Sequence, residues 1–320
     1  MNSTDKDLQN RIDSLIQAGT AENTRRAYAS DIKRFWAWAD QTLGIQTIYP
    51  IQVNVILQFI MDHLPLDDNE QILKISTIQR YLASISVYHQ EHGHPTPTTD
   101  PQAKLLLRRA KRALANQRPN KKAPITIEIL QRLLAACDPN TLRGLRDRTI
   151  LSLGFSCGGR RRDELAHLQY NDLTKTSDGY LLTISRSKTD QEQRGLTVPV
   201  TGQAVTYLDA WLLASGIRKG YLFRGIKPNG ELNKGIDGRT INRIVKHYIE
   251  KIGLDPDLYG GHSLRAGFLT STAELNIPLH QAMELSGHKD MSIASSYVHS
   301  TGLQQNPALN LLEQRLKQSG

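Results

Sequence analysis

The segment Gln117–Pro124 constrains the fold of this chain most strongly, because it divides the sequence in two. Its residues, QRPNKKAP, are polar and basic and include two prolines, which favour an extended, hinge-like backbone. The proline-rich stretch 93–98 is a rival boundary, but the helix expected after it would then have no second domain to join. We therefore predict a first domain over residues 1–117, a linker over 118–124 and a second domain over 125–320.

The first domain is predicted to be entirely helical. Apolar side chains recur at helical spacing between residues 23 and 39, with Asn23 or Thr24 as the expected N-cap and Gly44 as the end of the helix. Ser76 is the expected N-cap of a later helix. After the first helix, the pattern predicts helices at about 51–63, 76–92 and 101–116.

The second domain is predicted to combine helices with a small sheet. Thr126 and Thr141 are the expected N-caps of its first two helices. The short β-type runs 180–185 and 196–200, joined by a polar connection, predict a small antiparallel sheet. The chain is therefore predicted to be mainly α, with a small antiparallel β-sheet in the C-terminal domain. The helices are predicted at about 126–137, 141–156, 202–215, 237–252, 262–275 and 278–286.

The composition excludes several classes of protein. Hydrophobic residues make up 39% of the chain, which is enough for packed cores and too many for a disordered protein. The two cysteines, Cys137 and Cys157, are too few for a disulfide framework and lack the spacing of zinc ligands. The most apolar stretch, Val53–Met61, is too short to span a bilayer, and no signal peptide is visible. We expect a soluble, cytoplasmic protein with no metal, cofactor or membrane partner.

The net charge of +9 is informative through its distribution. Residues 104–122 carry eight Lys or Arg and no acidic residue. One interpretation is a solvated helix face. The interpretation we favour is a surface that contacts the phosphate backbone of a nucleic acid and leads into the linker.

An arginine-rich motif in the second domain suits phosphodiester chemistry. In GRRRDEL (159–165), Arg161 and Glu164 are three residues apart and share a helical face, so the glutamate can orient the arginine. The alternative is an ordinary surface ion pair, which contributes little. Arg160 and Arg162 flank Arg161, and the choice among the three rests on the position of Glu164.

A second motif, GHSLRAG (261–267), places His262 and Arg265 on one face of a predicted helix. A histidine in an isolated HxxR pattern is usually structural. The small residues Ala266 and Gly267 would let another backbone come close, which makes this motif more specific than HxxR alone.

His288 and Tyr297 are nine residues apart, which would put them on opposite faces of a continuous helix. They can meet at one site only if the helix breaks between them. Asp290 or Ser292 is the expected N-cap of a new helix that carries the tyrosine. The alternative is that Tyr297 is an ordinary half-buried tyrosine.

Lys188 lies on the connection between the two predicted strands, with Arg186 and Arg194 as nearby rivals. A lysine there is usually solvated, but it is also placed to act as a general acid. The basic residues of the motifs can bind and protonate a phosphodiester while Tyr297 attacks it and His262 accepts its proton. This set is equipped to cut DNA without a metal ion and to keep the broken end on the protein.

The motifs resemble those of the tyrosine recombinase (phage integrase) family. The order of the motifs and the spacing from His288 to Tyr297 both fit. The TRRAY…FWAW helix and the basic helix before the linker are similar to the core-binding domain of that family, so the resemblance covers nearly the whole chain in a Cre-like layout. It implies a helical core-binding domain and a catalytic domain that form a clamp around DNA.

The resemblance also implies a reaction. A tetramer on two inverted-repeat core sites cleaves and rejoins double-stranded DNA through a 3′-phosphotyrosyl intermediate and a Holliday junction, without metal or nucleotide, and accessory proteins are possible partners. The implied site residues are the nucleophile Tyr297, the phosphate-binding Arg161, Arg265 and His288, the general acid Lys188, the base His262 and the supporting Glu164.

The two ends of the chain refine this expectation. Too little sequence precedes residue 20 for an arm-binding domain like that of lambda-type integrases, which favours a recombinase of short core sites. A helix is predicted at about 306–318, with Asn306 as its N-cap and one stripe of leucines. This helix either packs on its own domain or, as we expect, docks in trans on a neighbouring protomer.

Two other kinds of protein stay open on the sequence. A type IB topoisomerase or a telomere resolvase would use a similar set of residues, and a DNA-binding protein with an inert pocket would use none of them for catalysis. The candidate DNA-binding residues are Arg25, Arg26, Arg80, Arg108, Arg109, Lys111, Arg112, Arg239, Arg243 and Lys246.

Overall fold

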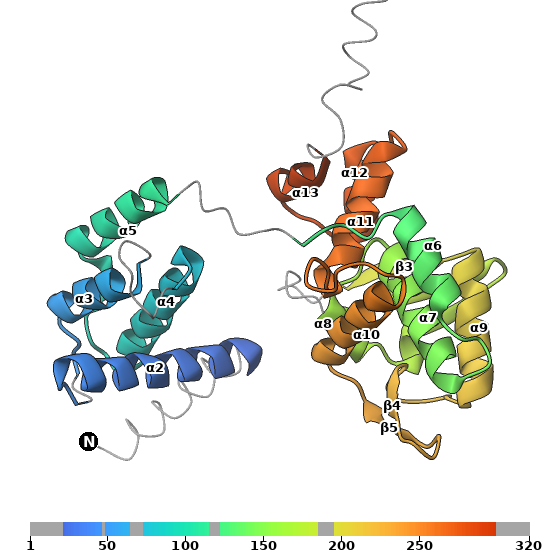
Figure 1. Cartoon of the computed structure of the whole chain (residues 1–320), viewed down its shortest axis with the longest axis horizontal. Coiled ribbons are helices and arrows are strands. Elements are labelled where there is room, and N and C mark those ends of the chain that lie inside the picture. The colour runs from blue at the N-terminus through green and yellow to red at the C-terminus, as the bar shows by residue number, and fades with distance from the viewer. Residues whose placement is uncertain (1–21, 47–48, 65–72, 115–121, 185–194, 299–320) are drawn as a thin grey trace, which may run out of the picture. The chain divides into compact units, whose positions relative to one another are not determined.

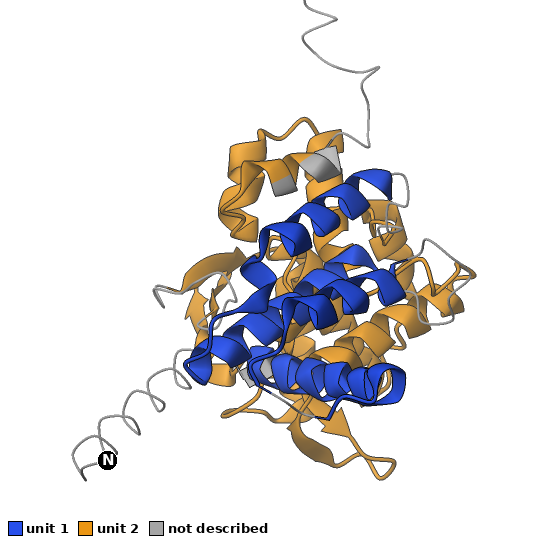
Figure 2. Cartoon of the chain, turned by 90° about the vertical axis from the view of Figure 1, so that its left-hand side faces the viewer, with its two compact units in different colours: residues 1–119 blue, residues 120–320 orange. Residues whose placement is uncertain are grey.

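The chain forms two compact units, each with its own hydrophobic core (Figure 2). Unit 1 is Met1–Pro119 and unit 2 is Asn120–Gly320. The computed structural model describes residues 22–46, 49–64, 73–114, 122–184 and 195–298.

The described part of unit 1 is helical, as its sequence pattern predicts (Figure 1). The helix α5 begins with Pro101 at its first position, and the Asp100 carboxylate accepts a hydrogen bond from the Gln102 backbone N–H. Its elements are α2 (Glu22–Leu43), α3 (Val53–His63), α4 (Ile75–Glu91), the 3-10 turn η1 (Pro97–Thr99) and α5 (Pro101–Ala113).

The predicted N-caps of two helices in unit 1 are wrong. Helix α2 already includes Glu22, so Asn23 and Thr24 lie inside its first turn. Helix α4 begins at Ile75, so Ser76 is also inside the helix. A capping side chain is a weak local preference, and the packing of an apolar face can start the helix a residue or two earlier.

Aromatic side chains hold the core of unit 1 together. Phe35 on α2 contacts Phe59 on α3 at 5.2 Å between ring centroids, and Trp38 contacts the same ring at 5.0 Å, both edge to face. Beside this core, the buried Asp31 carboxylate accepts hydrogen bonds from Arg80 on α4 at 2.6 Å and from the Ser84 hydroxyl at 2.9 Å. The arginine therefore fastens α4 to α2.

Unit 2 consists mainly of helices around one core, with two small antiparallel sheets among the described residues (Figure 1). Its helices are α6 (Ile127–Ala136), α7 (Leu142–Ser156), α8 (Arg162–His167), η2 (Tyr170–Asp172), α9 (Gln203–Ser215), α10 (Gly238–Lys251), α11 (Gly261–Glu274), α12 (Leu279–Ser286) and α13 (Met291–Val298).

The sheets confirm part of the strand prediction. One sheet has the order β1 (Leu173–Thr176), β2 (Gly179–Ile184), β3 (Leu196–Val200), in which β2 and β3 are the two predicted runs. Strand β1 and the second sheet, β4 (Arg224–Ile226) with β5 (Leu232–Gly235), were not predicted. These three strands are three or four residues long and carry few apolar side chains, so they give no period-two pattern.

The predicted caps of α6 and α7 have different outcomes. Thr141 caps α7 as expected, because its hydroxyl oxygen accepts a hydrogen bond from the Gly144 N–H at 3.1 Å. Thr126 occupies the N-cap position of α6, but its hydroxyl donates to the Glu128 carboxylate instead. The predicted position is confirmed there and the predicted capping bond is wrong.

Helix α11 lies at the centre of unit 2 and is packed against α6, α7, α10, α12 and α13. The chain that enters the unit crosses this helix: the Ile125 N–H donates to the Ser263 carbonyl at 2.9 Å. A Cβ at Gly267 would lie 1.8 Å from the Ile125 carbonyl oxygen, so only glycine admits the crossing segment. The close backbone approach expected at this motif is confirmed.

No helix in the described part of the chain combines the length and the apolar character that a membrane crossing requires.

Candidate active site

A tight turn places the arginine motif at the site. Helix α7 ends at Ser156, and Gly158 and Gly159 follow in the left-handed region, with φ of +85° and +68°. A Cβ at Gly159 would lie 2.7 Å from the Arg265 Cα. Glycine therefore lets this turn lie directly against α11, and the chain leaves the turn at the motif that begins α8.

Arg161 and Glu164 form the predicted pair. The Arg161 guanidinium donates to Glu164 Oε1 at 2.7 Å, and the Arg161 backbone N–H donates to Oε2 at 3.0 Å. The glutamate side chain is buried and the arginine side chain is 22% exposed. The neighbours differ: Arg160 is fully buried, whereas Arg162 is 41% exposed beside Asp163. Of the three arginines, Arg161 is the one held by a buried carboxylate while part of its side chain still reaches solvent.

Arg265 is a buried arginine that joins three parts of the site. Its Nη1 donates to the Gly159 carbonyl at 2.9 Å and to the Ser286 carbonyl at 2.7 Å. Its Nε donates to His288 Nε2 at 3.1 Å. The guanidinium therefore connects α11 with the glycine turn and with the end of α12.

His288 follows the end of α12. Gly287, with a φ of +65°, ends that helix directly before the histidine. Its Nδ1 lies 2.7 Å from the Ser286 hydroxyl. Burial, followed by the charges of Arg265 and Arg161, lowers the pKa of this histidine from its ordinary 6.5 to about 4. A neutral imidazole at this place can form hydrogen bonds without adding charge. Ser286 is a contact that sequence reasoning missed, although its place two residues before His288 was a visible signal.

His262 lies on the exposed side of α11, four positions before Ala266 and three before Arg265. The pKa of His262 is lowered below its ordinary value. The largest cause is the partial removal of the imidazole from water, and the charges of Arg162 and Arg161 come next. The imidazole is therefore neutral near pH 7 and can accept a proton.

The helix break between His288 and Tyr297 is confirmed. Asp290 caps the new helix α13, because its carboxylate accepts a hydrogen bond from the Ser292 N–H at 2.8 Å. Helix α13 packs on α11 and α12 and buries Ala294. The backbone of Tyr297 belongs to α13, but its side chain lies outside the described residues, as do Lys188, Arg186 and Arg194.

Arg161, Glu164, His262, Arg265 and His288 thus come together from three separate segments of unit 2. The charge of Arg161 acts on both histidines, and the charge of Arg265 does so as well. No group of three or more His, Cys, Asp or Glu in the described ranges is arranged to hold a metal ion. The site is a cluster of cations and neutral imidazoles, which suits an anionic substrate.

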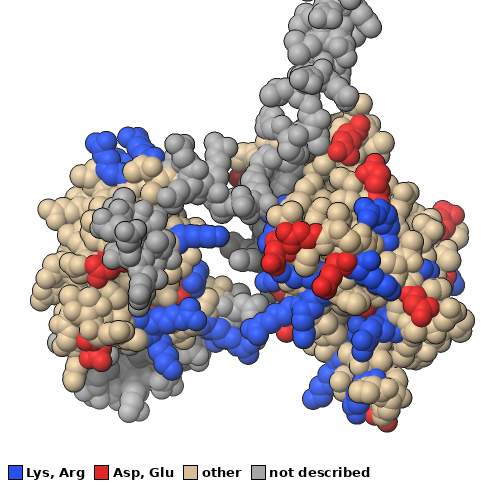
Figure 3. All heavy atoms as spheres, viewed as in Figure 1, with Lys and Arg blue, Asp and Glu red and all other residues tan. Residues whose placement is uncertain are grey.

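Basic side chains form several patches on the visible face of each unit, among residues that are mostly neutral (Figure 3). Among the candidate DNA-binding residues, Arg80, Arg243 and Lys246 contact side chains of the protein. Arg80 is bound by Asp31, Lys246 lies 2.7 Å from the Asp257 carboxylate and Arg243 donates to the Thr240 hydroxyl. The remaining candidates are exposed on α2, α5 and α10: Arg25, Arg26, Arg108, Arg109, Lys111, Arg112 and Arg239.

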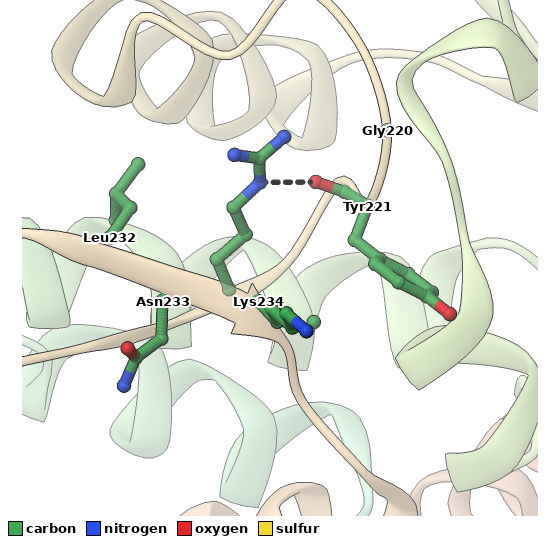
Figure 4. Close-up of a pocket in the computed structure, with 7 residues that line it drawn as sticks. Gly220, Tyr221, Leu232, Asn233 and Lys234 are labelled. Atoms are coloured by element: carbon green, nitrogen blue, oxygen red, sulfur yellow. Dashed lines mark hydrogen bonds between the residues drawn. The ribbon is translucent and has the colours of Figure 1, made fainter.

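A shallow hollow of about 510 Å³ lies on the β4–β5 hairpin (Figure 4). Tyr221, Arg224, Asn233 and Lys234 line it, and Arg224 Nε donates to the Tyr221 carbonyl at 3.1 Å. None of the residues of the cationic cluster lines this hollow, so it is separate from the candidate active site.

The sequence matches two related families. Residues 125–303 match the phage integrase family, and residues 12–92 match the N-terminal SAM-like domain of phage integrases. The first match covers most of unit 2 and the second covers most of unit 1.

Curated relatives are recombinases. The chain is 33% identical over 305 residues to an integrase/recombinase XerD homolog of Selenomonas ruminantium, which covers 92% of this chain and 86% of the relative. It is 26% identical to the tyrosine recombinase XerD of Lacticaseibacillus casei, with 89% and 90% covered. It is 22% identical to the recombinase Cre of Escherichia phage P1, with 75% of each chain covered.

Solved structures share the fold. The Tn1549 transposon integrase in complex with a circular intermediate DNA aligns with a TM-score of 0.62 at 15% identity, over 97% of this chain and 98% of that one. The XerH site-specific recombinase bound to its difH substrate aligns with a TM-score of 0.59 at 17% identity, over 87% and 76%. With these matches added to the geometry of the site, the chain belongs to the phage integrase family and is a tyrosine recombinase.

Proposed function

We propose that this chain is a site-specific DNA recombinase that cleaves and rejoins DNA through a phosphotyrosyl link at Tyr297. One observation supports the proposal most directly: Arg161 and Arg265 converge with two neutral histidines in unit 2. Helix α13, which carries the backbone of Tyr297, packs on α11 and α12. The relatives named as recombinases support the same reaction.

In the proposed reaction, the arginines bind the non-bridging oxygens of the scissile phosphate. Arg161 and Arg265 keep their charge at any relevant pH, and a guanidinium group is a strong hydrogen-bond donor to phosphate oxygens. His288, neutral at pH 7, lies beside Arg265 and accepts a hydrogen bond from its Nε. Negative charge that builds on the phosphorane is thus met by groups already held in place by Glu164 and by backbone carbonyls.

Two proton transfers complete the proposed step. The Tyr297 oxygen attacks phosphorus, its proton passes to His262, and the bond from phosphorus to the 5′ oxygen breaks. Lys188 donates a proton to that 5′ oxygen, which leaves a free hydroxyl. The product is a 3′-phosphotyrosyl bond, whose energy is available for rejoining, so the step consumes no nucleotide and uses no metal.

The proposal extends to the DNA and to the assembly. Unit 1 and unit 2 would clamp double-stranded DNA at an inverted-repeat core site, with the exposed arginines of α2 and α5 on the phosphate backbone. Four protomers on two sites would exchange strands through a Holliday junction. We further propose that the predicted helix at 306–318 docks on a neighbouring protomer and that the reaction occurs in the cytoplasm of a prokaryote, where accessory proteins can take part.

Covalent trapping on nicked suicide duplexes tests the proposal. A randomised library of such duplexes is incubated with the wild-type chain and with Tyr297→Phe, and complexes that survive SDS are sequenced. Capture that needs Tyr297 and enriches an inverted repeat supports the recombinase. Capture without sequence enrichment would favour a type IB topoisomerase. An enriched site that closes into a hairpin end would favour a telomere resolvase, and binding without capture would favour an inert DNA-binding protein.

A further inference from the structure

Arg160 has no role in the proposed reaction, yet it touches the backbone that presents His288. Its Nη2 donates to the Leu285 carbonyl at 2.5 Å and to the Gly158 carbonyl at 3.3 Å. Leu285 belongs to the last turn of α12, three residues before the histidine. Arg265 makes the parallel pair of contacts one residue further along in both segments. Two guanidinium groups therefore fasten the end of α12 to the glycine turn.

The second terminal nitrogen of Arg160, Nη1, faces Glu164, the carboxylate that holds Arg161. Arg160 Nη1 lies 3.8 Å from Glu164 Oε2, and the second oxygen of that carboxylate holds Arg161 at 2.7 Å. The Arg160 side chain therefore spans the distance between the support of Arg161 and the support of His288.

The environment of Arg160 is unusual for an arginine. Its side chain is 2% exposed, and its Nε has no hydrogen-bond partner in the described part of the chain. Burial of a charge is unfavourable unless specific contacts compensate for it. The contacts with Leu285, Gly158 and Glu164 are the ones that do so here.

The turn is built to allow the contact with α12. A Cβ at Gly158 would lie 2.2 Å from the Leu285 carbonyl oxygen and 2.9 Å from Arg160 Nη2, and the φ of this glycine is +85°. Any other residue would therefore push α12 away from the turn. The glycine and the buried arginine are independent features that serve one contact.

We propose that Arg160 is a positioning residue for the recombination reaction: it fixes the His288 side of the phosphate site to the Arg161 side through Leu285 and Glu164. The inference rests on the proposed function of the site. Arg160 itself touches no DNA in this account; it keeps the groups that bind the scissile phosphate at their correct separation.

The pKa of His288 gives a second measurement of the effect of Arg160, independent of the reaction rate. His288 is faced by Arg265 from α11, by Arg161 and Arg160 from the segment before α8, and by Glu164 from α8. Burial and the three arginines lower the pKa of His288, and the glutamate opposes them. Removal of Arg160 therefore raises this pKa even when no DNA is present.

Three variants of the full chain test the proposal. Arg160→Met removes both the contacts and the charge, and Arg160→Lys keeps the charge but cannot make the same forked contacts. Arg132→Met is the matched control, because Arg132 also donates to a carbonyl at a helix end, that of Ile252, away from the site. The readouts are the rate of covalent capture of a suicide duplex enriched by the wild-type chain, and the pKa of His288 from NMR titration of the DNA-free protein.

We expect Arg160→Met to capture saturating DNA on the order of 10²-fold more slowly, with the half-saturating DNA concentration unchanged, because small displacements of reacting groups cost rates of this size. The pKa of His288 should rise, because one of the cations that lower it is gone. Arg160→Lys should be slow while the histidine pKa stays low, and Arg132→Met should match the wild type. A wild-type capture rate in Arg160→Met, together with an unmoved pKa, would overturn the proposal.

A second route covers the case in which Arg160→Met does not fold. Gly158→Ala keeps the arginine in the sequence but puts a methyl group 2.2 Å from the Leu285 carbonyl oxygen and 2.9 Å from Arg160 Nη2, so it disturbs the same contact and should also slow capture. A wild-type rate in folded Gly158→Ala and Arg160→Lys would overturn the proposal. Failure of the proposed function looks different: the wild type would then capture no DNA, while the titration of His288 would still report whether Arg160 acts on it.

Discussion

Arg265 and His288 face each other across the centre of the site, with the arginine Nε 3.1 Å from the histidine Nε2. A permanently charged donor directed at the ring holds the imidazole in its neutral form. The same arginine ties the Gly159 and Ser286 carbonyls, so the orientation of the histidine depends on three segments at once.

The first prediction concerns stability and pH. The pKa of His288 is about 4 in the folded chain against an ordinary 6.5, so the unfolded chain binds more protons between these values. The contribution of His288 to the free energy of unfolding should be complete above about pH 6.5. It should be lost progressively as the pH falls towards 4. Urea unfolding at a series of pH values measures this slope. His288→Gln should flatten it, and an equally steep slope in that variant would contradict the assignment.

The second prediction concerns the carboxylate behind Arg161. Glu164→Gln removes the charge that holds Arg161 and faces Arg160 in a buried setting, so capture of a suicide duplex should slow by about 10-fold or more while DNA is still bound. The matched control is Glu231→Gln, which breaks the exposed Lys227–Glu231 pair on the β4–β5 hairpin and should leave the rate unchanged. Equal rates in the two variants would show that Glu164 has no such role.

The third prediction concerns the segment around Ile125 that crosses α11. Gly267→Ala puts a methyl group 1.8 Å from the Ile125 carbonyl, so the backbone must move, and the free energy of unfolding should fall by about 1–3 kcal/mol or more. Gly253→Ala is the control: its φ is +79° but the space around it is open, so it should cost only about 1–2 kcal/mol. Chemical denaturation compares the two, and a smaller loss in Gly267→Ala would contradict the packing described above.

The fourth prediction separates structural from DNA-binding arginines. Arg80→Ala leaves the buried Asp31 without its main partner and should destabilise unit 1 by about 1–3 kcal/mol. Arg108→Ala removes an exposed side chain of α5 and should leave stability unchanged. It should weaken DNA binding, and the slope of the logarithm of the binding constant against the logarithm of the salt concentration should fall by about 1, the value for one phosphate contact. Thermal melts and binding titrations over a salt series measure both effects. Stability losses of the same size in both variants would refute the distinction.

Much of the fold could be predicted from the sequence because its helices carry clear apolar periodicity. Helices α7 and α9 start within about one residue of their predicted positions, and β3 matches its predicted run. The short strands β1, β4 and β5 could not be predicted, since three or four mostly polar residues carry no period. The caps at Asn23 and Ser76 failed because tertiary packing outweighs a local capping preference.

Part of the candidate active site could likewise be predicted from the sequence, and part could not. The pairing of Arg161 with Glu164 and the helix break before Tyr297 follow from spacing, and the structure has both. The burial of Arg160 could not be predicted, because three consecutive arginines look alike in a sequence and only the fold decides which one points inwards. The contact between Arg265 and the end of α12 joins residues 21 apart and likewise needs the tertiary structure.

The central claim is that Tyr297 is the residue that becomes linked to DNA, and identification of the attachment site tests it most directly. The SDS-resistant complex is digested with nuclease and trypsin, and the peptides are analysed by mass spectrometry. The account predicts a nucleotide remnant joined through its 3′ phosphate to Tyr297, on the peptide of residues 290–315. A remnant on any other residue, or capture that persists in Tyr297→Phe, would contradict it.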